Sequence, residues 1–152
     1  GHFDHIWDNA SLQRHFEGIP LICHTLDAFL LQSDVFDLGL TPSNPTFLIE
    51  AYKSKQTLSL EGIEIHFHHF PGHTPGCCMI EIQGHIFSGD FIFYRSIGRS
   101  DFAYSNPDDM RESLLRFESM QELATMPVYP GHGEGTMACD EQANVKFWIS
   151  RV

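Results

Sequence analysis

Histidine and aspartate residues occur in four short segments, one at the start of the chain and three at the ends of predicted strands. The later segments span residues 71–76, 88–90 and 129–133, and each sits in a turn rich in glycine or proline. Together the four segments supply His2, Asp4, His5, His73, Asp90 and His132. Loops at strand ends are where the sites of layered α/β proteins usually collect. A single segment could be an ordinary polar turn, but four of them predict a shared site in an α/β fold.

The donor types in these segments are those of a metal site. Imidazole and carboxylate ligands suit borderline divalent ions such as zinc, iron and manganese. The chain has 10 histidines against 9 Lys+Arg residues, and histidine is the commonest metal ligand. The first segment, His2 to His5, is expected to be a loop that precedes the first helix.

The hydrophobic pattern predicts one mixed α/β domain over residues 1–152. Residues 8–17 are predicted to form an amphipathic helix that directs Leu12 and Phe16 toward the core. A longer helix at 107–123 begins with Pro107 and directs Leu114, Leu115 and Phe117 inward. The remaining predicted elements are strands at 20–23, 57–60, 63–67, 77–82, 85–87 and 126–129, helices at 25–32 and 140–151, a tight turn at Gln83 and Gly84, and a loop around 41–45.

Composition excludes several classes of function. With 9 Lys+Arg against 20 Asp+Glu, the net charge is −11, which repels a phosphate backbone, so we expect no nucleic-acid partner. No segment approaches the roughly 18 apolar residues of a membrane span, and the given N-terminus shows no positively charged region followed by an apolar stretch, so we expect a cytoplasmic protein without a membrane partner. The four cysteines (Cys23, Cys77, Cys78 and Cys139) fit no paired zinc spacing and are interpreted as reduced core residues.

These motifs resemble those of a known family. The segment from His2 to His5 is similar to the end of the His-x-His-x-Asp-His signature of metallo-β-lactamase-fold proteins. His73, Asp90 and His132 fall where that family keeps its third, bridging and last ligands. The PGHTPGC, FSGD, IGRSDF and YPGHG sequences look most like the short, single-domain branch related to glyoxalase II, the hydroxyacylglutathione hydrolases. The resemblance implies a four-layer αβ/βα sandwich.

The resemblance also implies a ligand set and a reaction. It places His2 and His73 on a first metal ion, Asp4, His5 and His132 on a second, and Asp90 between them. Two divalent ions, most plausibly zinc, with iron or manganese as alternatives, would then activate a bridging hydroxide that attacks a small-molecule thioester. Asp4 would help to orient this nucleophile.

The family signature has one further histidine, two positions before His2, and the chain begins at Gly1. We therefore expect the given sequence to be incomplete at its N-terminus and to lack the family's first strands. The expected consequence is that the first metal position has one protein ligand fewer than the family pattern.

Other interpretations of function stay open at this stage. A mononuclear iron oxygenase that oxidises persulfides, a lactonase, and an inactive metal-binding remnant would share much of this ligand set. His69 could support a ligand indirectly, whereas His66 and His68 lie on a predicted polar face and are not expected to bind metal. Arg99 and Asp101 could bind substrate or pair with each other. The sequence does not indicate an oligomeric state.

Overall fold

The computed structural model describes all residues, 1–152, and divides the chain into two compact units, Gly1–Glu50 and Ala51–Val152. Each unit has its own hydrophobic core. The single-domain organisation stays a prediction, as does the cytoplasmic location. None of the helices combines the length and the apolar character that a membrane-spanning helix requires.

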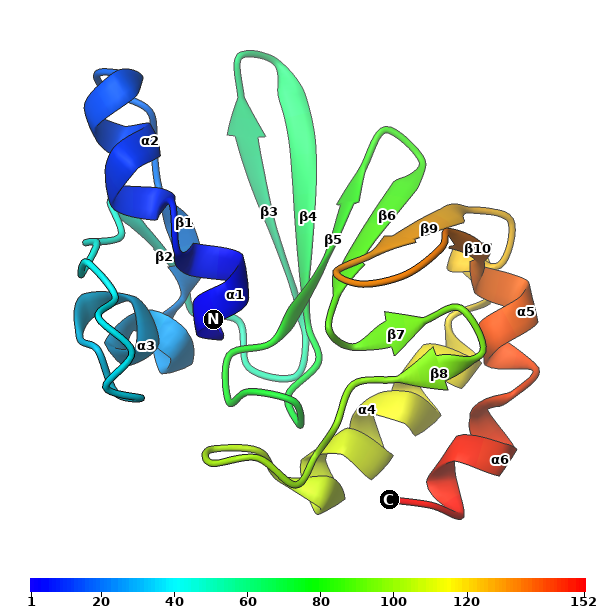
Figure 1. Ribbon diagram of the computed structural model, residues 1–152. Helices are drawn as coiled ribbons and strands as arrows, with labels where there is room; N and C mark the ends of the chain where they lie inside the picture. Colours follow the sequence, from blue (N-terminus) through cyan, green and yellow to red (C-terminus); the bar gives the residue numbers. More distant parts are fainter. The chain divides into compact units, whose positions relative to one another are not determined.

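The first unit is built around a two-stranded parallel sheet. Its elements are α1 (Phe3–Ile6), α2 (Asn9–His15), β1 (Ile22–His24), the 3-10 turn η1 (Thr25–Asp27), α3 (Ala28–Gln32) and β2 (Phe47–Ile49) (Figure 1). β1 pairs with β2, Ile22 opposite Phe47. The core of this unit contains Ile6, Leu30, Leu31 and Leu40.

Two predictions for the first unit are wrong. The segment expected to be a loop contains a helical turn, α1, because Ile6 joins the core of the unit and anchors the turn. Leu12 and Phe16, expected to face the core, are both about half exposed, and α2 buries none of its residues. The leucines of α3 fill this core instead.

The second unit contains a six-stranded mixed sheet with the order β10-β9-β6-β5-β4-β3 (Figure 1). Its strands are β3 (Lys55–Leu60), β4 (Ile63–His69), β5 (Cys78–Ile82), β6 (His85–Gly89), β9 (Pro127–Pro130) and β10 (Thr136–Met137). A separate hairpin consists of β7 (Ile92–Phe93) and β8 (Ser96–Ile97). Its helical elements are α4 (Pro107–Ser119), the 3-10 turn η2 (Gln121–Leu123), α5 (Ala138–Gln142) and α6 (Val145–Ile149).

Strand direction in this sheet brings three loops to one edge. β4 and β6 are both antiparallel to β5, so they run in the same direction, and β6 is parallel to its neighbour β9. The loops that follow β4, β6 and β9 therefore leave the same edge of the sheet. The turn between β5 and β6 allows this arrangement, because Gln83 and Gly84 both adopt positive φ values, 49° and 76°, as a tight two-residue hairpin requires.

Aromatic packing holds α4 against the unit's core. The rings of Phe70 and Phe91 stack with centroids 4.6 Å apart, and Phe117 of α4 meets Phe91 edge-on at 5.9 Å. All three side chains are fully buried, and each such burial contributes roughly 1.5–3 kcal/mol of stability.

The helix prediction for α4 is confirmed in most respects. Asn106 caps the helix by accepting hydrogen bonds from the amides of Asp108 and Asp109, and Pro107 occupies the first turn. Leu114 and Phe117 are buried as expected. Leu115 is not, because the buried face follows Met110, Ser113, Leu114 and Phe117, whose helical spacing leaves position 115 to one side.

Other elements differ from the sequence prediction. The C-terminal helix is interrupted, giving α5 and α6. None of the four cysteines forms a disulfide bond. Cys77 lies in the core, but Cys139 is exposed in the first turn of α5, so its assignment to the core is wrong. The strands β2, β7, β8 and β10 have two or three residues each and are too short to show an alternating pattern.

Candidate metal centre

Three of the six predicted ligands meet within the second unit. The Oδ2 atom of Asp90 lies 3.3 Å from Nε2 of His73 and 3.5 Å from Nε2 of His132. Asp90 directly follows β6, and His132 follows the parallel neighbour β9. The amide of Gly131 donates to the carbonyl of Gly89 at 2.8 Å and ties these two loops together. One carboxylate oxygen therefore faces two imidazole nitrogens at the sheet edge.

The orientation of His73 suits metal binding. Its Nδ1 lies 2.8 Å from the backbone carbonyl oxygen of Arg99. Because a carbonyl oxygen only accepts, Nδ1 carries the proton and Nε2 presents its lone pair toward Asp90. Metal-binding histidines commonly have this arrangement, with the second ring nitrogen held by a carbonyl or a carboxylate. The donor set and its orientation thus fit a divalent cation.

Gly98 allows the backbone that follows β8 to pass close to Asp90 and His73. A Cβ atom added at this residue would lie 1.7 Å from the carbonyl oxygen of Asp90 and 3.2 Å from Nδ1 of His73. Any side chain at position 98 would displace the backbone that orients the two ligands.

The loop that carries His73 is held by hydrogen bonds from α4 and from the two residues that precede this helix. The Ser113 hydroxyl donates to the carbonyl of Pro71 at 2.7 Å, and the Ser105 hydroxyl donates to the carbonyl of His73 at 2.7 Å. The backbone N–H of Asn106 donates to the carbonyl of Gly72, which lies between these two residues of the loop, at 2.8 Å. These bonds satisfy successive carbonyls of a sharply turning loop and so restrict its motion.

His69 holds the same loop from its other side. This side chain is fully buried, and its Nε2 donates to the carbonyl of Pro75 at 2.8 Å. Its Nδ1 accepts from the amide of Lys53 at 2.9 Å. His69 thus contacts the loop that carries His73, and both of its ring nitrogens form hydrogen bonds.

The other three predicted ligands belong to the first unit. His2 precedes α1 and is buried, with its ring edge-on to Phe36 at 5.8 Å. Asp4 and His5 lie in α1, and Oδ2 of Asp4 is 3.6 Å from Nε2 of His5. Asp4 and His5 therefore bring two donor groups close together within the first unit.

The histidines not expected to bind metal have hydrogen-bonding roles. Nε2 of His68 lies 2.9 Å from Oε2 of Glu81, and burial lowers the pKa of His68 despite this carboxylate. Nδ1 of His66 lies 2.8 Å from the Thr57 hydroxyl.

Arg99 and Asp101 pair with each other. Nε and Nη2 of Arg99 donate to the two carboxylate oxygens of Asp101, at 2.8 and 2.9 Å. This bidentate pair raises the pKa of Arg99 and holds the pKa of Asp101 below its usual value. Of the two interpretations drawn from the sequence, the structure shows the pairing.

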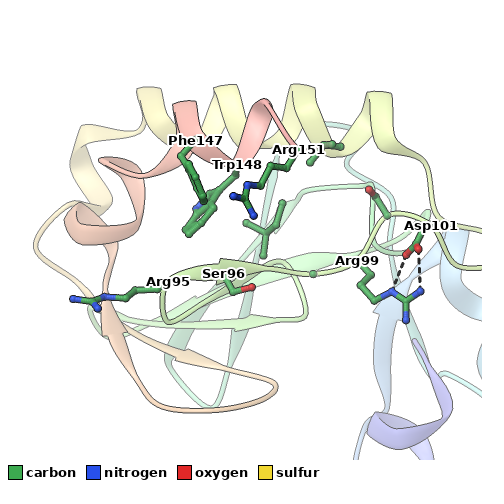
Figure 2. A pocket seen from close by; sticks show the side chains of 11 residues that line it. Arg95, Ser96, Arg99, Asp101, Phe147, Trp148 and Arg151 are labelled. Atoms are coloured by element: carbon green, nitrogen blue, oxygen red, sulfur yellow. Dashed lines mark hydrogen bonds and ion pairs between the residues drawn. The ribbon is translucent and has the colours of Figure 1, made fainter.

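A cavity of about 440 Å³ lies between the segment 95–101 and helix α6 (Figure 2). Figure 2 shows Arg151 beside Phe147 and Trp148, and its guanidinium carbon lies 4.2 Å from the centroid of the Phe147 ring. Gly98 and Arg99 form part of the lining, so the backbone that orients His73 also borders this cavity.

Glu141 is a structural residue that the sequence did not reveal. Its side chain is fully buried, and Oε1 accepts hydrogen bonds from the Arg95 amide at 3.0 Å and the Thr136 hydroxyl at 2.8 Å. It therefore ties the β7–β8 turn to β10, which follows the His132 loop. A glutamate in a predicted helix carries no signal that distinguishes it from a solvated surface residue.

Comparisons with known proteins agree with this geometry. The family described as the Metallo-beta-lactamase superfamily matches residues 1–132. The hydroxyacylglutathione hydrolase GloC of Haemophilus influenzae is 30% identical over 159 residues, covering 99% of this chain and 74% of the relative. The BLEG-1 B3 metallo-beta-lactamase has a TM-score of 0.80 at 27% identity, covering 96% of this chain and 72% of that structure. TTHA1623, crystallised in a di-iron-bound form, has a TM-score of 0.71 at 30% identity, covering 92% of this chain and 70% of that structure.

The family match covers most of the chain, and the three predicted ligands brought together in the second unit occupy the expected loops. The fold predicted from the motifs is therefore confirmed. The chain belongs to the metallo-β-lactamase superfamily and has the metallo-β-lactamase fold.

Proposed function

We propose that this protein is a metal-dependent hydrolase of thioesters such as hydroxyacylglutathione. The observation that carries the proposal is the position of Asp90, one carboxylate oxygen of which lies 3.3 Å from Nε2 of His73 and 3.5 Å from Nε2 of His132. A carboxylate in this position can serve two cations at once. The likeness to GloC supports the choice of a thioester substrate.

In this proposal the six sequence ligands form two metal positions. His2 and His73 belong to the first, Asp4, His5 and His132 to the second, and Asp90 is shared. Zinc is the proposed ion, because a closed-shell borderline cation suits a set of histidine and aspartate donors. The di-iron form of TTHA1623 makes iron the principal alternative.

Two bound cations would supply a water of lowered pKa and a Lewis acid for the substrate carbonyl. The protein's own residues then orient the reaction. Arg99, through its carbonyl, keeps the proton of His73 on Nδ1, so that Nε2 is the nitrogen that would bind metal. Asp4 orients the attacking water. A thiolate leaves readily, because the pKa of its parent thiol is only about 8.5, so the site needs no strong general acid.

A substrate panel tests this proposal. The metal-loaded protein is expected to cleave an acylglutathione thioester in preference to a β-lactam, a lactone and a phosphodiester. Oxygen consumption is recorded in parallel with a glutathione persulfide. Iron-dependent oxygen consumption without thioester cleavage would replace the proposal by the oxygenase alternative, and preferential lactone cleavage would replace it by a lactonase.

The His132→Ala substitution is expected to lower metal content by close to one ion per chain. The reason is that His132 supplies one of the ligands of the proposed second position, and losing a direct ligand costs at least the roughly 10–100-fold in affinity seen for supporting residues. The measurement is plasma emission on folded protein after dialysis. His66→Ala is the matched control, since His66 bonds Thr57 instead, and equal metal content in the two variants would contradict the ligand assignment.

A further inference from the structure

Phe102 lies beside His73, one of the two proposed histidine ligands of the second unit. Its ring centroid is 6.2 Å from that of His73, at an interplanar angle of 77°. The Phe102 side chain is 43% exposed, so a large apolar surface borders the candidate site. Partly exposed aromatic rings of this kind are common walls of small-molecule sites.

Arg99 supports this ring. Its guanidinium carbon lies 4.1 Å from the centroid of the Phe102 ring, which is a close cation–π contact. Asp101 fixes the guanidinium through two parallel hydrogen bonds, as the dashed lines in Figure 2 show. One side chain thus connects a carboxylate to the aromatic wall, and the backbone carbonyl of the same residue orients His73.

The pairing also determines what Arg99 offers to a ligand. Its charge is balanced by Asp101, and two of its nitrogens are already used. An arginine in this state is poorly suited to capture a substrate carboxylate, whereas the ring that it supports remains accessible. The surface that this corner offers to a ligand is therefore apolar rather than cationic.

We propose that Phe102 determines substrate specificity by forming an apolar wall for the acyl group, and that Arg99 and Asp101 are positioning residues for this ring. The proposal rests on the proposed thioester hydrolysis and specifies its substrate class. The preferred substrates carry an apolar, preferably aromatic, acyl group. The thiol half of the substrate is not recognised by Arg99.

The test uses four thioesters with the metal-loaded protein. Acetyl and phenylacetyl groups are each joined to glutathione and to N-acetylcysteamine, so that acyl size and thiol charge vary independently. In Phe102→Ala, the preference for phenylacetyl over acetyl is expected to fall about tenfold. The loss should appear mainly in KM, because the wall binds the ground state and the transition state alike. Phe102→Tyr should keep the preference.

Arg99→Gln separates the two roles of the arginine. If it positions Phe102, the acyl preference falls about threefold for both thiols, since an exposed cation–π contact is worth roughly 0.5–1 kcal/mol. A selective loss with glutathione thioesters would instead identify Arg99 as an anion-binding residue and overturn its positioning role.

Phe147 and Arg151 provide matched controls. Phe147 is 51% exposed and also stacks with an arginine, at 4.2 Å, but it lies on α6. Phe147→Ala and Arg151→Gln are expected to leave the acyl preference unchanged. If Phe147→Ala reduced it as much as Phe102→Ala, the proposal would be wrong.

Equilibrium binding separates this proposal from the proposed reaction. Phenylacetate and acetate, the two acid products, are titrated into the metal-loaded protein by calorimetry, which requires no turnover. Phenylacetate should bind about tenfold more weakly to Phe102→Ala, and acetate equally to both proteins. If phenylacetate bound Phe102→Ala as tightly as it binds the wild-type protein, Phe102 would not form the acyl-binding wall and the proposal would be wrong. Absence of thioester cleavage by the wild-type protein, with this binding difference intact, overturns only the reaction.

Discussion

Substituting Gly98 with alanine is expected to destabilise the second unit by at least about 3 kcal/mol, the upper end of ordinary overpacking. The added Cβ would lie 1.7 Å from the carbonyl oxygen of Asp90. No rotation of a side chain can relieve this clash, because the backbone fixes the position of the Cβ and the oxygen is itself a backbone atom. The backbone must shift, and with it the Arg99 carbonyl that orients His73. The free energy of unfolding is measured by urea denaturation.

Gly135→Ala is the matched control for this prediction. A Cβ at Gly135 would also meet a backbone carbonyl oxygen first, that of Val128, but at 3.3 Å. A small change in unfolding midpoint is therefore expected. Similar midpoints for the two alanine variants would show that the chain does not pass behind Asp90 as described.

Asp90→Asn is expected to lower kcat/KM for thioesters by about 10³-fold, which is the scale seen when one group that stabilises a transition state is lost. The amide keeps the size of the side chain but removes the negative charge that two cations would share. Metal content should fall together with the rate. The measurements are steady-state kinetics and plasma emission on the same preparation.

Asp108→Asn controls for loss of an acidic residue. Asp108 lies in the first turn of α4, where it pairs with Arg111 at 3.0 Å. Its substitution should leave the rate and the metal content unchanged. Full activity of Asp90→Asn would rule out the bridging role.

The central part of the candidate site was predictable from the sequence because its residues lie in recognisable turns. His73, Asp90 and His132 each follow a strand within a segment rich in glycine or proline. Alternating hydrophobicity located the strands, and parallel pairing of β6 with β9 then places Asp90 and His132 side by side. Local patterns located the three residues and the resemblance to a known family joined them into one site, whereas the direction of the strands is known only from the structure.

Helix orientation was harder to predict. The spacing of Leu12 and Phe16 is that of a buried helical face, but both side chains are about half exposed. The spacing within a helix does not reveal whether a neighbouring element packs against that face. Leu115 shows the same limit within an otherwise correct helix. In each case the packing of distant residues decides the orientation.

The supporting contacts were not predictable at all. The bond from Ser105 to the His73 carbonyl and the two bonds accepted by Glu141 join residues from different elements. No local pattern marks such a serine or glutamate, because the same residue types are common on solvated helices and loops. The pairing of Arg99 with Asp101 was one of two open alternatives for the same reason.

Hydrolysis of hydroxyacylglutathione before and after removal of metal is the most direct test of the proposed function. The zinc-loaded protein is expected to release glutathione, chelation should reduce the rate by at least about 10²-fold, and added zinc should restore it, because the nucleophile depends on bound metal. An unchanged rate after complete removal of metal, or no glutathione release by the fully loaded protein, would contradict the account.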